Sequence, residues 1–153
     1  MRINIIAIGK FKKNCPNKEL FLDYVKKTKF KINLIEIDAK ISGSINEIKE
    51  KEGEFILNKI PKNSKIILLD ETGLNLTSRE FARKIEQFQT QSISEISIII
   101  GGANGVSEKI KQKANLTISF GKMTFPHMMI RSMLAEQIYR SFLIINNHPY
   151  HKD

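Results

Sequence analysis

The sequence predicts an α/β fold with a mainly parallel β-sheet and helices on both of its faces. Short runs of β-branched and aliphatic residues alternate along the whole chain with longer segments that carry an apolar stripe at helical spacing. The short runs have no polar face, and a strand that is apolar on both sides has to be covered on both sides, as in parallel sheets. The 153 residues show no internal repeat and no linker-like stretch. Residues 1–153 are therefore expected to form a single domain.

Five strands are expected in this sheet. The first is closed by Gly9, the third is almost entirely aliphatic, and the fourth ends at the pair Gly101-Gly102. The segments are 3–8, 32–37, 66–69, 96–100 and 116–119.

Five helices are expected between and after these strands. Pro61 stops the second helix, Thr77 or Ser78 caps the third, and Pro126 suits the first turn of the last. The segments are 18–27, 47–60, a stretch that includes 81–88, 107–113 and 126–145.

The last helix has apolar residues on two sides. Met129 and Met133 lie on one side, and the other side carries Ile130, Leu134, Ile138 and Phe142. A helix that is apolar over so wide an arc has to be buried on both sides. A core contact on one side and a contact with a second subunit on the other would bury it, although core burial alone would also do so.

Composition favours a polyanionic partner. Lys and Arg outnumber Asp and Glu by 25 to 16, which gives a formal charge of +9 and attracts nucleic acid or an anionic membrane surface. The alternative is a basic but otherwise ordinary protein.

The single cysteine, Cys15, fits a reducing compartment. No signal peptide opens the chain and no run reaches the roughly 18 apolar residues of a membrane span, so we expect a cytoplasmic protein with no membrane partner.

The glycine cluster 101–105 follows a buried strand, where open α/β sheets bind their ligands. A tight turn without any ligand is an equally good interpretation of the cluster alone. It is not a dinucleotide fingerprint, because Ala103 and Val106 stand where that pattern needs glycine. The pair Gly121-Lys122 is not a phosphate-binding loop either, because Leu116 replaces its first glycine. NAD and ATP are both disfavoured.

The segment 119–127 joins the fifth strand to the last helix and is a second candidate for ligand binding. Its free backbone groups can read the edge of an adenine, while Phe120, Met123 and Phe125 offer apolar walls. His127 lies at the start of the helix, where the helix dipole favours the neutral imidazole. A structural hydrogen bond is the default role of any single histidine.

The C-terminal tail, residues 146–153, combines two histidines, a tyrosine and a lysine. Chain ends are usually frayed and chemically silent. These groups can nevertheless contact phosphate, stack on a base or move a proton.

Taken together, these segments resemble the RlmH family, the bacterial large-subunit ribosomal RNA pseudouridine methyltransferases of the SPOUT superfamily. The resemblance runs from the first strand through the segment 51–53 to the last residues, and so covers essentially the whole chain. Its most specific motifs are the block 120–127 and the ending Tyr150-His151-Lys152. The other matching segments are 100–105, 116–119 and 136–140.

The resemblance implies a C-terminal trefoil knot, a homodimer and S-adenosyl-L-methionine as the cofactor, which lies in the knot near the subunit interface. Ordinary chain topology would have argued against a knot. Carried over by position, the cofactor contacts are Leu69, Gly101, Phe120, Gly121, Lys122, Met123, Thr124 and Phe125.

The reaction implied is methyl transfer to N3 of a pseudouridine in 23S ribosomal RNA. N3 carries a proton that has to leave, so the site needs aligned geometry and a proton acceptor. The expected catalytic residues are His127, Arg131, Tyr150 and His151, with the tail reaching across from the partner subunit. Arg131 would stabilise negative charge on the uracil ring. A chain this small has little surface for reading RNA, which favours the large subunit or the whole ribosome as substrate.

The main alternative is a non-catalytic basic module that binds RNA or the ribosome. It explains the charge and the tail, but it gives no reason for the loop 120–125 beside a glycine turn. A SPOUT methyltransferase acting on transfer RNA is disfavoured because no RNA-binding domain is added to the short chain. The histidines and acids show no ligand spacing, so no metal is expected.

Overall fold

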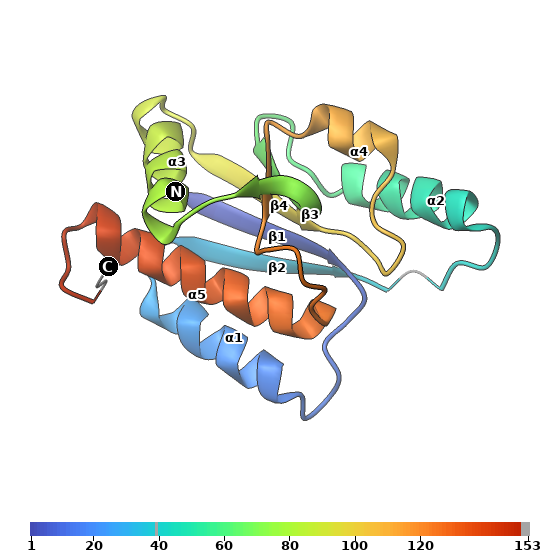
Figure 1. Ribbon diagram of the computed structural model, residues 1–153, viewed down its shortest axis with the longest axis horizontal. Helices are drawn as coiled ribbons and strands as arrows, with labels where there is room; N and C mark the ends of the chain where they lie inside the picture. The colour runs from blue at the N-terminus through green and yellow to red at the C-terminus, as the bar shows by residue number, and fades with distance from the viewer. Residues whose placement is uncertain (39, 151–153) are drawn as a thin grey trace.

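The computed structural model describes residues 1–38 and 40–150 and confirms the expected α/β architecture (Figure 1). In this part of the chain the strands are β1 (Arg2–Ile8), β2 (Lys31–Ile37), β3 (Lys65–Asn75), β4 (Glu95–Ile100) and β5 (Leu116–Ser119). The helices are α1 (Pro16–Lys27), α2 (Ile45–Leu57), α3 (Ser78–Thr90), α4 (Glu108–Lys113) and α5 (His127–Ile145).

The strands form one parallel sheet in the order β2-β1-β4-β3-β5. Because they all run in the same direction, their carboxyl ends meet at one edge of the sheet. The register places Leu69 of β3 beside Ile100 of β4, and Ile100 beside Ala7 of β1. The glycine turn after β4 and the loops after β1 and β3 therefore start next to one another.

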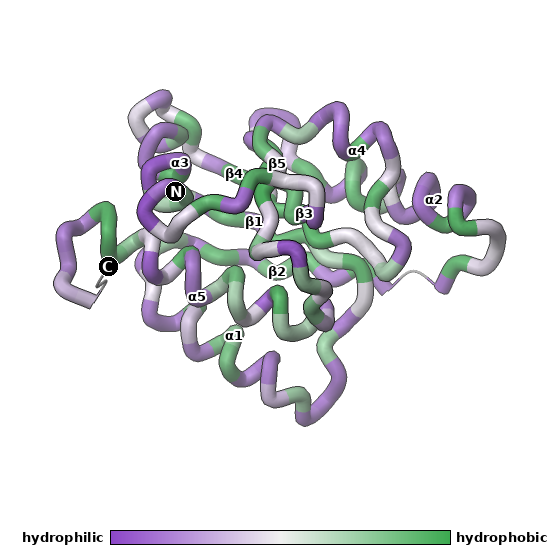
Figure 2. Tube along the Cα trace, in the orientation of Figure 1, coloured by the Kyte–Doolittle hydropathy of each residue, from purple (hydrophilic) through white to green (hydrophobic). Residues whose placement is uncertain are grey.

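Helices cover both faces of the sheet, as the apolar strands require (Figures 1 and 2). Alternate residues along each strand point to opposite faces, so the sheet has two cores. On one face Ile5 and Ile98 pack with Phe21 of α1, Ile85 of α3 and Leu134 of α5. On the other face a smaller core contains Ile6, Ile99, Ile56 of α2 and Ile110 of α4.

Side-chain caps determine where two of the helices begin. Ser44 caps α2 in a reciprocal arrangement with Glu47, so this helix starts before the predicted residue 47. Thr77, rather than Ser78, caps α3: its hydroxyl accepts from the backbone N–H of Glu80 at 3.2 Å. Pro126 is the N-cap residue of α5 and lies just before its first turn.

Strand β3 is longer than the sequence suggested. The predicted strand ended at residue 69, whereas β3 continues to Asn75 through an irregularity between Leu69 and Leu74. This extension pairs with β5, and a Cβ atom at Gly73 would lie 2.5 Å from the carbonyl carbon of Ile118. Only glycine allows this approach of the two backbones.

Two further predictions from the sequence concern a trefoil knot and the absence of membrane-spanning helices. The trefoil knot that the family resemblance implies stays a prediction. In the described part of the chain, no helix combines the length and the apolar character that crossing a bilayer requires.

The contact at Gly73 yields a prediction about stability. We expect Gly73→Ala to lower the free energy of unfolding by about 1–3 kcal/mol, because the added methyl group meets the backbone of β5, which cannot step aside as a side chain can. Chemical denaturation measures the change. Glu71→Ala, at an exposed position of the same strand, is the control and should change stability by less than about 0.5 kcal/mol. Equal stability of the two variants would contradict the close approach.

Candidate functional site

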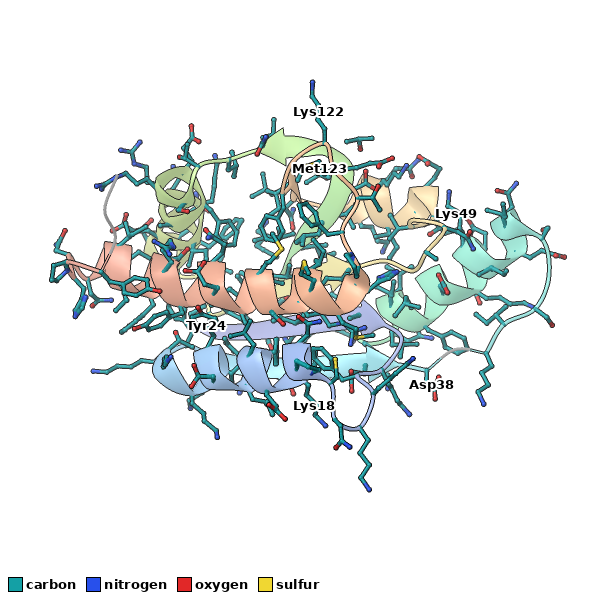
Figure 3. The ribbon with its side chains drawn as sticks, turned by 60° about the horizontal axis from the view of Figure 1, so that its bottom comes forward. Lys18, Tyr24, Asp38, Lys49, Lys122 and Met123 are labelled. Carbon is teal, nitrogen blue, oxygen red and sulfur yellow. The ribbon has the colours of Figure 1, made fainter. Side chains whose placement is uncertain are left out.

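A cavity of about 370 Å³ opens at the carboxyl edge of the sheet. The end of β3, the glycine turn after β4, the loop after β5 and the first turn of α5 form its walls. Among its lining residues are His127 and all but one of the predicted cofactor contacts, namely Leu69, Gly101, Phe120, Gly121, Met123, Thr124 and Phe125. Lys122 is the exception, because its side chain points away from the body of the protein (Figure 3).

The glycine turn places peptide groups, with no side chain over them, at the wall of the cavity. The N–H of Gly105 donates to the carbonyl of Gly102 at 3.0 Å, which closes the turn. A Cβ atom at Gly101 would lie 2.6 Å from Cγ1 of Val106 and 3.2 Å from the backbone of Gly105. The turn is therefore too compact for a side chain at Gly101, and peptide groups face the cavity instead.

The loop after β5 is held by its own hydrogen bonds. The Ser119 hydroxyl donates to the carbonyl of Gly121 at 2.8 Å and accepts from its N–H at 3.1 Å. Gly121 has a φ of 122°, a conformation that favours glycine. Phe120 and Phe125 are half-buried, while Met123 is 77% exposed and lies at the surface of the loop (Figure 3).

His127 combines a position on the cavity wall with a perturbed imidazole. Burial lowers its pKa, and the nearby Arg131 cation lowers it further, while a hydrogen bond with the backbone of Gly101 acts in the opposite direction. The predicted preference for neutral imidazole therefore has burial as its main cause. A neutral histidine can accept a proton at neutral pH.

Arg131 lies behind the cavity wall and does not line the cavity. Its side chain is 0% exposed. Nη1 donates to Oε1 of Glu36 at 2.8 Å, and Nη2 donates to the carbonyls of Ile8 and Gly9 at 2.8 and 3.0 Å. Burial lowers the pKa of Arg131, and Glu36 counteracts this. Because its donors face the carboxyl ends of β1 and β2, the expected contact with the uracil ring is not what this structure shows.

Tyr150 is also far from the cavity within this chain. Its ring packs on Tyr139 with centroids 5.2 Å apart, and the guanidinium of Arg140 lies 5.0 Å from its centroid. These contacts are in the C-terminal half of α5, whereas the cavity is lined by the first turn of this helix. His151, the other tail residue predicted to be catalytic, lies outside the described residues.

Comparison with known proteins gives the family. A family model described as "Predicted SPOUT methyltransferase" matches residues 1–151. The chain belongs to the SPOUT methyltransferase family. The RlmH-like motifs predicted this membership, and an enzyme of the methyltransferase class replaces the non-catalytic module as the interpretation of the chain.

Curated relatives match over their whole length. The chain is 44% identical to "Ribosomal RNA large subunit methyltransferase H" of Halothermothrix orenii, over 99% of this chain and 100% of that protein. It is 45% identical to the protein of the same name from Acholeplasma laidlawii, again over 99% and 100%. Among solved structures, a probable methylase family protein from Haemophilus influenzae has a TM-score of 0.56 and 16% identity, over 99% of this chain and 70% of that one. That likeness concerns the fold alone.

The acidic lining of this SPOUT methyltransferase was missed by the sequence reasoning. Asp70 follows Leu69 and lines the cavity. Burial raises its pKa, but hydrogen bonds from the hydroxyl and N–H of Thr72, together with Lys111 and Lys49, outweigh this and leave the pKa below its ordinary value. The cavity therefore contains an ionised carboxylate, which suits a cationic ligand. The sequence signal for Asp70 was its position directly after the predicted strand 66–69.

A second acidic group lies behind the glycine turn. Glu52 of α2 is buried, and burial raises its pKa. A Cβ atom at Gly102 would lie 2.6 Å from Oε2 of Glu52, and one at Gly53 would lie 2.4 Å from the hydroxyl of Ser107. Helix α2 thus packs directly on the turn that lines the cavity. A glycine inside a helical segment was the signal of this close packing.

An apolar groove of about 530 Å³ runs along α1, α3 and α5 and shares the segment 118–120 with the cavity. Its lining includes Leu20, which is 46% exposed, and Met129, which is 41% exposed. Among the described residues the methionine side of α5 is therefore only partly covered, whereas the opposite side, with Leu134 and Ile138, lies in the core.

Metal binding has no support in the described ranges, 1–38 and 40–150, where no three His, Cys, Asp or Glu side chains come together as ligands.

The position of His127 predicts its titration. We expect NMR to give this imidazole a pKa below the ordinary value of about 6.5, because burial and Arg131 disfavour the cation. Between the lowered pKa and about 6.5 the unfolded chain binds more protons than the folded one, so the contribution of His127 to stability is present above this window and is lost as the pH falls through it. His127→Gln should make stability less dependent on pH in this window. A pKa at or above about 6.5 would contradict the burial argument.

Proposed function

We propose that this protein transfers the methyl group of S-adenosyl-L-methionine to N3 of a pseudouridine in 23S ribosomal RNA, on the large subunit or the assembled ribosome. The observation that carries the proposal is the cavity at the ends of β3 and β4, whose walls include backbone, aromatic side chains and the carboxylates of Asp70 and Glu71, of which Asp70 has a lowered pKa. Relatives whose names specify a ribosomal RNA large subunit methyltransferase cover the whole chain, which supports RNA as the substrate.

The residues around the cavity fit this cofactor. S-adenosyl-L-methionine supplies an electrophilic methyl group on a sulfonium, and it carries an adenine and an ammonium cation. Peptide groups at Gly101 and along 120–125 can read the edge of the adenine, and Phe120 and Phe125 offer apolar surface to its faces. The ionised carboxylate of Asp70 complements positive charge. Lys122, the remaining predicted contact, would act through its backbone, because its side chain points outward.

The proton on N3 has to be accepted by a group near the mouth of the cavity. His127 is the only one of the four predicted catalytic residues that the structure brings to the cavity among those it describes, and its lowered pKa suits a proton acceptor. Tyr150 and His151 remain candidates for the same task if they arrive from a partner subunit. We rank His151 as the acceptor above Tyr150 because imidazole titrates near neutral pH.

The length of α5 favours a homodimer with shared sites. His127 at the cavity and Tyr139, on which Tyr150 packs, are 12 positions apart on this helix, which is about 18 Å along its axis. Tyr150 therefore lies well away from the cavity of its own chain. A twofold partner packed on the groove of α1 and α5, with its α5 antiparallel, would bring its tail beside this cavity. The exposed Leu20 and Met129 would be buried there.

Arg131 is better interpreted as a positioning residue than as a catalytic one. It lies one turn after His127 on α5 and binds the ends of β1 and β2. It therefore fixes the first turn of α5 against the edge of the sheet, which sets where His127 meets the cavity. Its charge also contributes to the lowered pKa of that imidazole.

Calorimetric titration with S-adenosyl-L-methionine tests the cofactor directly. We expect saturable binding by the wild-type protein and none by Gly101→Leu, because the new side chain has no room beside Val106 and Gly105. Asn63→Leu adds the same side chain at an exposed position before β3, at the opposite edge of the sheet, and should bind normally. Absence of wild-type binding at millimolar cofactor would contradict the proposal and favour a non-catalytic RNA-binding role.

Mixed dimers test whether the sites are shared. Gly101→Leu and His151→Ala should each abolish methylation of ribosomes on their own. Co-expressed, they should recover roughly a quarter of the wild-type activity, because half of the dimers are mixed and each has one intact cavity served by one intact tail. A site built from a single chain would show no recovery, which would contradict the shared arrangement.

A further inference from the structure

The loop between β1 and α1, residues 9–15, presents positive charge on a fixed backbone. Lys12 and Lys13 are exposed, while Phe11 between them and Lys10 is buried. The N–H of Phe11 donates to Oε1 of Glu36 at 2.6 Å, and its ring lies 4.9 Å from Cζ of Arg131. The Glu36 carboxylate and the Arg131 guanidinium, which fix the start of α5, therefore also hold this loop in place.

This loop lies at the same edge of the sheet as the cavity. Strand β1 is the neighbour of β4, and the glycine turn after β4 lines the cavity. The carbonyl of Gly9, at the start of the loop, accepts from Arg131, one helical turn beyond His127. On the far side of the cavity, the loop after β5 carries the outward-pointing Lys122 (Figure 3). Basic loops thus flank the cavity on both sides.

The charges of Lys12 and Lys13 are not neutralised within the described part of the chain. Several other lysines are paired: Lys10 with Asp38 at 3.4 Å, Lys109 with Glu50 at 3.5 Å and Lys111 with Glu108 at 3.2 Å. No ion pair or hydrogen bond of the described residues engages the ammonium groups of Lys12 and Lys13. Uncompensated lysines on an ordered loop attract phosphate.

The orientation of the loop's apolar side chain distinguishes between two possible anionic partners, a membrane surface and a phosphate backbone. A membrane-binding loop offers exposed apolar side chains for insertion, together with its lysines. Here Phe11, the single aromatic residue of the loop, faces inward. The exposed surface therefore suits a phosphate backbone rather than a lipid surface.

We infer that Lys12 and Lys13 bind the phosphate backbone of the RNA substrate and hold it across the mouth of the cavity, with Lys122 on the opposite side. This inference rests on the proposed function and adds to it the surface that binds the RNA backbone. Such contacts position the substrate without reading its sequence.

The test compares two charge-matched double variants with the wild-type homodimer. Lys12→Ala with Lys13→Ala removes the proposed contacts. Lys59→Ala with Lys62→Ala removes two exposed lysines at the end of α2 and before β3, at the opposite edge of the sheet. Methylation of unmodified 70S ribosomes gives KM and kcat as functions of salt, and calorimetry gives the affinity for S-adenosyl-L-methionine.

We expect the first double variant to raise KM for ribosomes about tenfold at low salt, with kcat and cofactor affinity unchanged. The slope of log KM against log salt should fall by about 1.5, because two phosphate contacts are lost. The control should keep wild-type values. Equal effects of both double variants, or a wild-type KM for the first, would overturn the inference while leaving the proposed function intact. A wild-type protein that binds cofactor but does not methylate ribosomes would instead overturn the proposed function, and the inference with it.

Discussion

The buried guanidinium of Arg131 joins parts of the chain that are far apart in sequence, and the functional edge of the sheet depends on it. It binds Glu36 at the end of β2, the carbonyls of Ile8 and Gly9 at the end of β1, and the ring of Phe11 in the following loop. A buried cation is unfavourable unless it is paired, and loss of either partner of such a pair is strongly destabilising. The ends of two strands, one loop and the first turns of α5 are therefore held in one arrangement.

That arrangement explains how a small parallel sheet makes a ligand site without a large domain. The common direction of the strands brings the loops after β1, β3, β4 and β5 to one edge, and α5 starts at the same edge. Glycine at 101 keeps the turn after β4 narrow, and the packing of α2 on Gly102 supports it from behind. The cavity is thus shaped by close backbone contacts, and polar side chains such as Asp70, Thr124 and His127 also line it.

Local sequence patterns predicted the features that depend on neighbouring residues. The strands and helices followed from apolar periodicity, and the cap of α3 was predicted at Thr77 or Ser78, because these signals act over a few positions. The same reasoning made the glycine turn and the loop 120–125 candidates for ligand binding, and the family resemblance named the cofactor contacts within them. The burial of Arg131 could not be predicted, because its partner Glu36 is 95 positions away. The contact of Gly73 with Ile118 is equally non-local, so the strand there was predicted to end too early.

The position of Tyr150 bears on how the proposed catalytic site is assembled. The potential proton acceptors in the described residues are separated along α5, with His127 in its first turn and Tyr150 packed on Tyr139 in its C-terminal half. Under the proposed function, two copies that pack their α5 helices antiparallel would each bury the exposed Met129 side of the other helix and bring the tail to the other cavity. Under the proposed function, dimerisation is then part of the catalytic site itself, and an isolated subunit would bind cofactor at an unfinished site.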